Sequence, residues 1–256
     1  MNKKKIIQII CIVIAILLIG FGVWKLAPMV VSLFSEKDVI SVDPSPTPSD
    51  DQREPAVQKA ENPIDFKTLQ EANDEIYAYI QVDGTKVDYP VVQSRADDNF
   101  YLKHRAEDRA YSESGAVYSQ SANGWEFLDP VTVLYGHNGY GDTFFTTLHS
   151  FEDKAFFDAH DTFVIYTPDR KLTYKIFSAF KYDDRHLLNS FDLANEDVLA
   201  EFQKILLDPP SVVKSVRDGV TLDKESKVVI LSTCITGQKE NRYLVCGVMI
   251  NDEPTE

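Results

Sequence analysis

The sequence contains few cysteines, an excess of acidic over basic residues, and no internal repeat. Of its 256 residues, three are cysteine, and 26 Lys and Arg stand against 40 Asp and Glu, giving a formal net charge of −14. This shortage of positive charge argues against binding to nucleic acid or to anionic lipid headgroups, because both carry negative charge. No acidic cluster has the spacing of a calcium loop, and Asp97-Asp98 alone is weak evidence for one. A solvated surface explains the acidic balance.

Charge is missing altogether from one long N-terminal stretch. A basic segment, residues 1–5, precedes residues 6–24, whose polar exceptions are one glutamine and two glycines. Nineteen residues at about 1.5 Å each span roughly the 30 Å hydrocarbon core of a membrane. The apolar character continues through Phe34, and no good cleavage site follows, which disfavours the alternative of a cleaved signal peptide. We therefore predict a transmembrane anchor region at residues 6–34, with its basic end in the cytoplasm and the rest of the chain outside the membrane.

The remainder of the chain divides into a spacer, one domain and a short tail. Residues 35–63 contain the segment DPSPTPSDDQREP and no periodic apolar pattern, which is typical of a solvated extracellular linker. Residues 64–252 suffice for one domain with a substantial core, and residues 253–256 form a C-terminal tail. Because residues 1–35 hold four lysines and no acid, the rest carries 22 basic against 40 acidic residues, a formal charge of −18.

A predicted hairpin near the C-terminus brings a thiol and a guanidinium together. An apolar run, residues 228–231, leads to Cys234 at its end. Arg242 begins a second apolar run, and a short polar segment containing glycine lies between the two. If the two strands pair antiparallel about Gln238, positions 234 and 242 face each other, because their numbers average to 238. A thiol is a strong nucleophile only as the thiolate, and a fixed positive charge nearby stabilises that form.

The same register bears on a disulfide. Cys11 lies in the predicted anchor, which leaves Cys234 and Cys246 outside the membrane. With Cys246 opposite Ile230, the two thiols are four strand residues apart, or about 13 Å. A disulfide needs Cα atoms within about 7 Å, so the register disfavours this bridge, and Cys246 is better explained as a small buried hydrophobe.

Short strands with interspersed helices, and no regular alternation of the two, predict a mainly β fold with added helices, in the form of a closed mixed β-barrel. The predicted helices are residues 66–79, residues 143–159, and a third that Asn195 caps and that runs to Leu207. The predicted strands are residues 79–82 and 86–92, forming a hairpin about Asp83-Gly84, and residues 115–118, 131–135, 162–167 and 172–180.

Five histidines are candidates for a general base. His137 differs from the others because it ends a predicted strand, in VTVLYGHNG, where two glycines let the chain turn and expose the ring. The other four have charged, helical or loop surroundings and are predicted to be structural or solvated: His104, His149, His160 and His186. Zinc is the competing use of a cysteine and a histidine, but it needs three or four ligands, and the sequence has no cluster with metal-ligand spacing.

These features together resemble the sortase family of membrane-anchored cysteine transpeptidases of Gram-positive bacteria. The resemblance rests on an apolar N-terminus, then YGHN, then LSTC, then Arg242 at the start of the last strand. Among the classes of the family it is similar to class B in the segments DGTKVDYPVVQ and DDNFYL and in a long insertion at about residues 183–227. The absence of a second C-terminal apolar segment and of an inhibitory lid argues against the pilus-building class C.

The resemblance implies a closed eight-stranded sortase-type β-barrel and a role for each of five residues. Cys234 would be the nucleophile, His137 the proton donor and acceptor, and Arg242 the residue that orients the sorting peptide and stabilises the oxyanion. Ser232 and Leu102 match positions that line the peptide groove in class B. Neither a cofactor nor a metal is implied. Ile235 departs from the class, since some members carry an acid after the cysteine, and a third catalytic carboxylate is therefore not predicted.

The implied reaction is cleavage of the C-terminal sorting signal of a secreted protein between Thr and Gly, through a thioacyl enzyme. Transfer to an amino group of the cell wall, or of a peptidoglycan precursor, would anchor surface proteins to peptidoglycan. The implied partners are the sorting-signal peptide, that amine, and the membrane through the N-terminal helix, with no nucleic acid.

Three alternatives remain open at the level of sequence. The first is a pilin polymerase, which would use a pilin lysine as the amine. The second is a non-enzymatic surface binding protein built on the same barrel. In the third, Cys234 and Cys246 would form the redox pair of a thiol redox protein, which requires a bridge between them.

Overall fold

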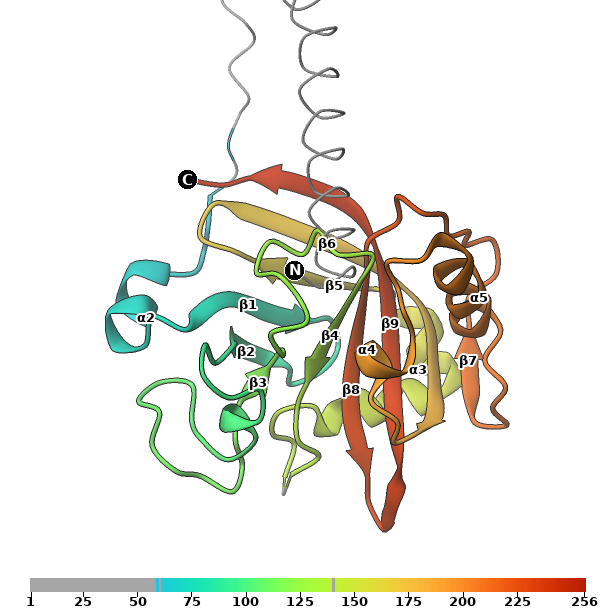
Figure 1. The fold of residues 1–256 in the computed structure, drawn as a ribbon, viewed down its shortest axis with the longest axis horizontal. Coiled ribbons are helices and arrows are strands. Elements are labelled where there is room, and N and C mark those ends of the chain that lie inside the picture. Colours follow the sequence, from blue (N-terminus) through green and yellow to red (C-terminus); the bar gives the residue numbers. More distant parts are fainter. Residues whose placement is uncertain (1–58, 60, 140) are drawn as a thin grey trace, which may run out of the picture. The chain divides into compact units, whose positions relative to one another are not determined.

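The predicted barrel is present as one sheet that closes on itself (Figure 1). This computed structural model describes residues 59, 61–139 and 141–256. Strand neighbours around the ring are, in order, β5 (Thr162–Tyr166), β1 (Ile76–Val82), β2 (Asp88–Val92), β3 (Val117–Tyr118), β4 (Val131–Tyr135), β8 (Val228–Ile235), β9 (Gln238–Pro254) and β6 (Arg170–Asp183). Pairing of β5 with β6 closes these eight strands, as predicted. A ninth strand, β7 (Lys214–Val216), pairs with β6 beyond the ring.

The strands next to the predicted site are buried on both faces. Along β4, β8 and β9, side chains that face the barrel interior alternate with side chains that face outward. Leu231 belongs to the interior cluster, for example, and its neighbour Ile230 to the cluster outside. Burial on both faces explains why the sequence before Cys234 is a continuous apolar run rather than an alternating one.

The outer face of these strands is covered by helices from the long insertion. Helix α5 (Glu196–Leu207) begins where predicted, because the side chain of Asn195 accepts hydrogen bonds from the backbone N–H groups of Asp197 and Val198. Its apolar face buries Leu199, Phe202 and Leu206 against the sheet, and burying such a side chain is worth about 2 kcal/mol. The short helix α4 (Leu187–Ser190) precedes it and buries Leu187 in the same cluster.

The predicted helix at residues 66–79 is too long. Helix α2 (Phe66–Ala72) ends at Asn73, whose side chain donates hydrogen bonds to the Tyr101 hydroxyl and the Ala106 carbonyl. From Ile76 onward the chain forms β1, paired on both sides with β2 and β5. The apolar spacing could not distinguish a helix from a buried strand, because β1 is buried at nearly every position.

The predicted helix at residues 143–159 is replaced by two short helices. They are the 3-10 helix η2 (Thr146–Glu152) and the α-helix α3 (Lys154–Ala159). Asp153 lies between them with extended backbone angles, and its side chain caps α3 by accepting from the Phe156 N–H. A further 3-10 helix, η1 (Phe100–Leu102), lies beside the site.

Both predicted hairpins are confirmed. The β1–β2 turn contains Gly84 at φ +73°, which a residue with a Cβ rarely adopts. In the β8–β9 hairpin, Cys234 lies opposite Arg242 and Ile230 lies opposite Cys246, the register expected from the sequence numbers. The last strand continues to Pro254, beyond residue 252.

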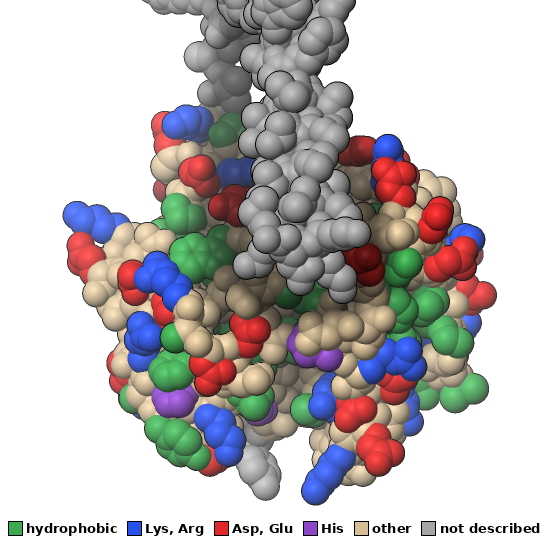
Figure 2. Space-filling view, viewed as in Figure 1, with side chains coloured by type: hydrophobic (Ala, Val, Ile, Leu, Met, Phe, Trp, Pro, Cys, Tyr) green, Lys and Arg blue, Asp and Glu red, His purple; other side chains and the backbone are tan. Residues whose placement is uncertain are grey.

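The prediction of a solvated surface concerns the described domain, and the prediction of a membrane anchor concerns the N-terminal residues. Acidic and basic side chains are interspersed over the visible face of the described region (Figure 2), as expected for a solvated surface. No helix within residues 59, 61–139 and 141–256 is long and apolar enough to cross a membrane. The predicted anchor, residues 6–34, and most of the predicted linker lie outside the described residues.

Candidate active site

The thiol of Cys234 lies at the open end of β8. Cys234 is exposed, although the six residues before it in the strand are buried. Directly after it, the ladder with β9 is irregular, and Ile235 lies opposite Gln238 at the tip of the hairpin. Cys234 and Cys246 are both free thiols, and with Cys246 opposite Ile230 they lie too far apart along the strand for the bridge that the redox alternative requires.

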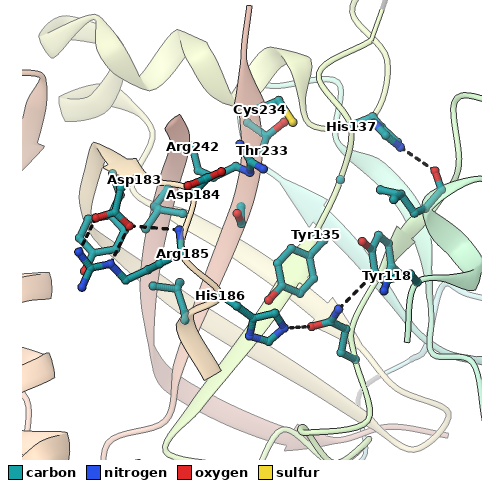
Figure 3. Close-up of a pocket in the computed structure, with 18 residues that line it drawn as sticks. Tyr118, Tyr135, His137, Asp183, Asp184, Arg185, His186, Thr233, Cys234 and Arg242 are labelled. Carbon is teal, nitrogen blue, oxygen red and sulfur yellow. Dashed lines mark hydrogen bonds and ion pairs between the residues drawn. The ribbon is translucent and has the colours of Figure 1, made fainter. Parts of the chain in front are cut away.

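His137 is level with Cys234 because β4 and β8 are parallel neighbours. Tyr135 pairs with Ser232, so two residues further along each strand bring position 137 beside position 234. The turn that follows β4 requires a glycine at position 136, since a Cβ there would lie 2.6 Å from the Phe145 ring. Figure 3 shows the sulfur of Cys234 on the side of its strand that faces His137.

A backbone carbonyl orients the His137 ring. Its Nε2 atom lies 2.7 Å from the carbonyl oxygen of Leu102, at the end of η1. Because a carbonyl only accepts, Nε2 must donate in this hydrogen bond, and in the neutral ring Nδ1 is then free to accept a proton. The Leu102 carbonyl thus fixes the orientation of the imidazole, and the residue after Cys234, Ile235, carries no carboxylate.

The guanidinium of Arg242 lies in the same region, and only one of its nitrogens is hydrogen-bonded to the described part of the protein. Its Nη1 group donates to the carbonyl oxygens of Lys239 and Asn241, both at 2.9 Å. These bonds fold the side chain back on its own hairpin and fix its position. Among the described residues, its Nε and Nη2 groups have no protein partner, so three N–H donors are available to a ligand.

All five predicted site residues line one cavity of about 250 Å³. Figure 3 shows Cys234, His137 and Arg242 around this cavity. Leu102 is exposed, whereas Ser232 is buried on β8. The remaining lining comes from the residue before η1, the β3–β4 region, the end of β6, the start of the long insertion and the β8–β9 hairpin: Asn99, Tyr118, Gln120, Tyr135, Gly136, Tyr182, Asp183, Asp184, Arg185, His186, Leu187, Thr233 and Leu244.

The profile of the sortase domain family matches residues 80–250, which contain every residue of this cavity. The chain belongs to the sortase family. It is 27% identical to sortase B of Listeria monocytogenes over 194 residues, which are 73% of this chain and 74% of that protein. Taken together with the solved structures described next, this similarity assigns it to class B.

Two solved class B structures share the fold of this sortase. The sortase B of Clostridium perfringens has 29% sequence identity and a TM-score of 0.65, and the match covers 73% of this chain and all of that one. A class B sortase of Streptococcus pyogenes involved in pilus biogenesis has 31% identity and a TM-score of 0.63, with 73% and 98% of the chains covered.

The inner part of the cavity of this class B sortase was not predicted. Tyr118 and Tyr135 stack at 5.4 Å between ring centroids, and His186 Nε2 lies 2.5 Å from the Gln120 side-chain oxygen. Burial raises the pKa of Tyr118 to about 12 and also raises that of Tyr135, so both remain neutral hydroxyls at physiological pH. Tyr135 could have been found from the sequence, because it is the last residue of β4 and lies two residues before His137.

A second histidine lies close to Cys234. His149, predicted to be structural or solvated, has its Nε2 atom 3.0 Å from the carbonyl oxygen of Cys234. Asn138 donates to the same oxygen at 3.0 Å. Position 149 is 85 residues from the cysteine, and no local pattern connects the two.

Proposed function

We propose that this class B sortase cleaves the C-terminal sorting signal of a secreted protein between Thr and Gly and transfers the new Thr carboxyl end to an amino group of the cell wall. The observation that carries the proposal is the convergence of a thiol, an imidazole and a guanidinium on one cavity. Each group has the chemistry that one step of acyl transfer needs.

In the first step, the Cys234 thiolate attacks the Thr carbonyl carbon and forms a tetrahedral intermediate. The free N–H donors of Arg242 stabilise the oxyanion. The imidazolium of His137 then protonates the Gly amine, the C–N bond breaks, and a thioester to Cys234 remains.

In the second step, the neutral imidazole of His137 removes a proton from the incoming amine. The amine nitrogen attacks the thioester carbonyl, a new amide bond forms, and the Cys234 thiolate leaves. One amide is exchanged for another, so the reaction consumes no nucleotide and requires no cofactor or metal.

The location proposed for this reaction is the outer face of the membrane. Residues 6–34 would anchor the chain with residues 1–5 in the cytoplasm, and residues 35–63 would hold the catalytic domain away from the bilayer. There the domain could meet both exported proteins and peptidoglycan precursors. A cysteine peptidase and acyltransferase at this position would anchor surface proteins to the cell wall.

A second candidate function is pilin polymerisation by the same chemistry. The observation that favours this second function is the similarity to the class B sortase of Streptococcus pyogenes, which is involved in pilus biogenesis. The two functions differ only in the amine that resolves the thioester: a pilin lysine in one case and a cell-wall amino group in the other.

The test is to incubate the full-length protein, in detergent micelles, with a panel of sorting-signal peptides and to determine the cleavage site by mass spectrometry. We expect cleavage between Thr and Gly, a thioacyl adduct on Cys234, and a fall in rate of about 10²- to 10⁴-fold in His137→Ala. Adding a lysine peptide or a peptidoglycan stem peptide then identifies the preferred amine. Peptide binding with neither cleavage nor adduct would contradict the proposal and favour the non-enzymatic binding protein.

A further inference from the structure

The backbone carbonyl of the nucleophile lies just beyond the end of a strand ladder. In the parallel pair of β4 and β8, the carbonyl of Ser232 accepts from the Gly136 N–H at 3.1 Å. The next carbonyl of β8 on that side belongs to Cys234, because orientation alternates along a strand. Strand β4 has ended by then, so it offers no backbone donor to this oxygen.

Two side chains take the place of the missing backbone donor. Asn138 Nδ2 and His149 Nε2 each lie 3.0 Å from the Cys234 oxygen. Asn138 follows the proposed base directly in sequence and also donates to the Thr236 hydroxyl at 3.1 Å. The peptide group that carries the nucleophile is therefore held from both the β4 turn and η2.

His149 is itself held at its other nitrogen and on its ring face. Its Nδ1 atom lies 2.6 Å from a carboxylate oxygen of Glu152, three residues later in η2. The ring stacks on Tyr243 with centroids 5.0 Å apart, and Tyr243 is buried on β9 opposite Thr233. With 23% of its side chain exposed, His149 has little freedom to leave this position.

His149 Nε2 lies 3.3 Å from Asn138 Nδ2, a group that only donates, and closer, at 3.0 Å, to the Cys234 carbonyl oxygen. Both a carboxylate and a carbonyl only accept, so the ring makes each of these two hydrogen bonds only through a protonated nitrogen. The contact with Glu152 holds Nδ1, and the other ring nitrogen, Nε2, then faces the Cys234 carbonyl.

We propose that His149, held by Glu152, is a positioning residue that fixes the backbone of Cys234 and so directs its thiol toward His137. The proposal rests on the proposed function, in which Cys234 is the nucleophile. Fixation is needed here because the ladder with β9 becomes irregular at Ile235, and the ladder with β4 has already ended. The direction of the Cα–Cβ bond follows the peptide plane, and displacing a reacting atom by about 1 Å can cost about 10²-fold in rate.

The test compares His149→Ala, His149→Gln and Glu152→Gln in the full-length protein in detergent micelles. The matched control is His160→Ala, since His160 also pairs with a carboxylate, Asp83 at 2.9 Å, but has no hydrogen bond to β8 within the described region. Two quantities are measured: kcat and KM for sorting-peptide cleavage, and the rate of iodoacetamide alkylation at Cys234, determined by peptide mass.

We expect His149→Ala to lower kcat by about 10- to 100-fold and to change KM by less than about threefold, because the nucleophile is displaced while the peptide groove is kept. His149→Gln should recover kcat to within about fivefold of wild type, because a glutamine Nε2 can replace the imidazole Nε2 as donor to the Cys234 carbonyl. Glu152→Gln should fall between the two. Alkylation of Cys234 should change by at least about threefold in His149→Ala and return toward wild type in His149→Gln.

Two results would overturn the proposal. One is a kcat for His149→Ala within twofold of the His160→Ala control. The other is a folded His149→Gln protein with no more activity than His149→Ala. If His149→Ala does not fold, the comparison of His149→Gln with Glu152→Gln decides, since donation to Cys234 is kept in the first and weakened in the second. Alkylation needs no sorting peptide, so failure of the proposed function would leave this readout intact.

Discussion

The two cysteines of the β8–β9 hairpin have the same side chain, but their positions in the sheet give them different environments. Cys246 lies opposite Ile230 in the middle of the hairpin, packed with the apolar side chains beneath α5. Cys234 lies four residues further along β8, where the strand leaves the core and its side chain is exposed. A few residues of strand length thus separate a packing group from a proposed nucleophile.

The surroundings of the two thiols differ in every respect that governs reactivity. Cys246 is completely buried, and burial raises the pKa of its thiol to about 12, so it remains neutral and acts as a small hydrophobe. Cys234 faces a cavity, with a guanidinium across the hairpin and an imidazole level with it on β4. Solvent access and neighbouring polar groups, rather than the local sequence, separate the two.

The largest effect is expected when each thiol is removed in turn. We expect Cys234→Ala to lower sorting-peptide cleavage by at least about 10³-fold, because no other group in the cavity can form the thioester. Its melting temperature should stay within about 2 °C of wild type, because the side chain is exposed. The measurements are cleavage by mass spectrometry and thermal unfolding.

Cys246→Ala is the matched control for that experiment, since it makes the same substitution on the same hairpin. It should retain activity and lose about 1 kcal/mol of unfolding free energy to the cavity that it leaves. Equal loss of activity in both variants would contradict the division of roles.

A smaller effect is expected when Arg242, at the open end of the hairpin, is replaced by a cation of different shape. Arg242→Lys should lower kcat/KM by about 10²-fold, because an ammonium cannot reproduce the fixed fork of donors or the two bonds that Nη1 makes to its own hairpin. Kinetics on the best peptide of the panel measure this loss. Arg105→Lys, at an exposed pair with Asp108, makes the same substitution away from the cavity and should be neutral. An Arg242→Lys enzyme within threefold of that control would show that charge alone suffices.

The smallest effect is expected on the unfolding free energy at alkaline pH, through Cys246, the buried cysteine of the hairpin. Since the folded pKa of Cys246 lies above its ordinary value near 9, its contribution to stability is complete below about pH 9 and is lost as pH rises toward 12. The unfolding free energy of wild type relative to Cys246→Ala should therefore fall by about 1 kcal/mol between pH 8 and pH 10. Urea unfolding at the two pH values measures it, with Cys234→Ala in parallel. A gap that stays constant would contradict deep burial of the Cys246 thiol in solution.

The parts of the fold that could be predicted are those fixed by neighbours in sequence. The β8–β9 register followed from the position of its turn, the start of α5 from the capping side chain of Asn195, and the β1–β2 turn from Asp83-Gly84. Each depends on interactions within a few residues of chain, which the sequence specifies directly.

The parts that could not be predicted depend on partners that are distant in sequence. The segment after Ala72 has helical spacing, but pairing with β2 and β5 makes it a strand. His149 has no local feature to separate it from other histidines in helical surroundings, and its contact with Cys234 exists because η2 packs beneath the hairpin. The tyrosines at the inner end of the cavity likewise meet only when β3 and β4 pair.

The sequence by itself determined the chemistry of this sortase: a thiol, an imidazole and a guanidinium at strand ends, with one hairpin register that puts two of them side by side. Only the tertiary structure decided how those groups are held. Parallel pairing of β4 with β8 brings His137 level with Cys234, the Leu102 carbonyl orients the imidazole, and Asn138 and His149 contact the carbonyl of Cys234. The physical reason is that the sequence specifies which chemical groups are present, whereas their exposure and orientation are set by contacts between segments that meet only in the folded barrel.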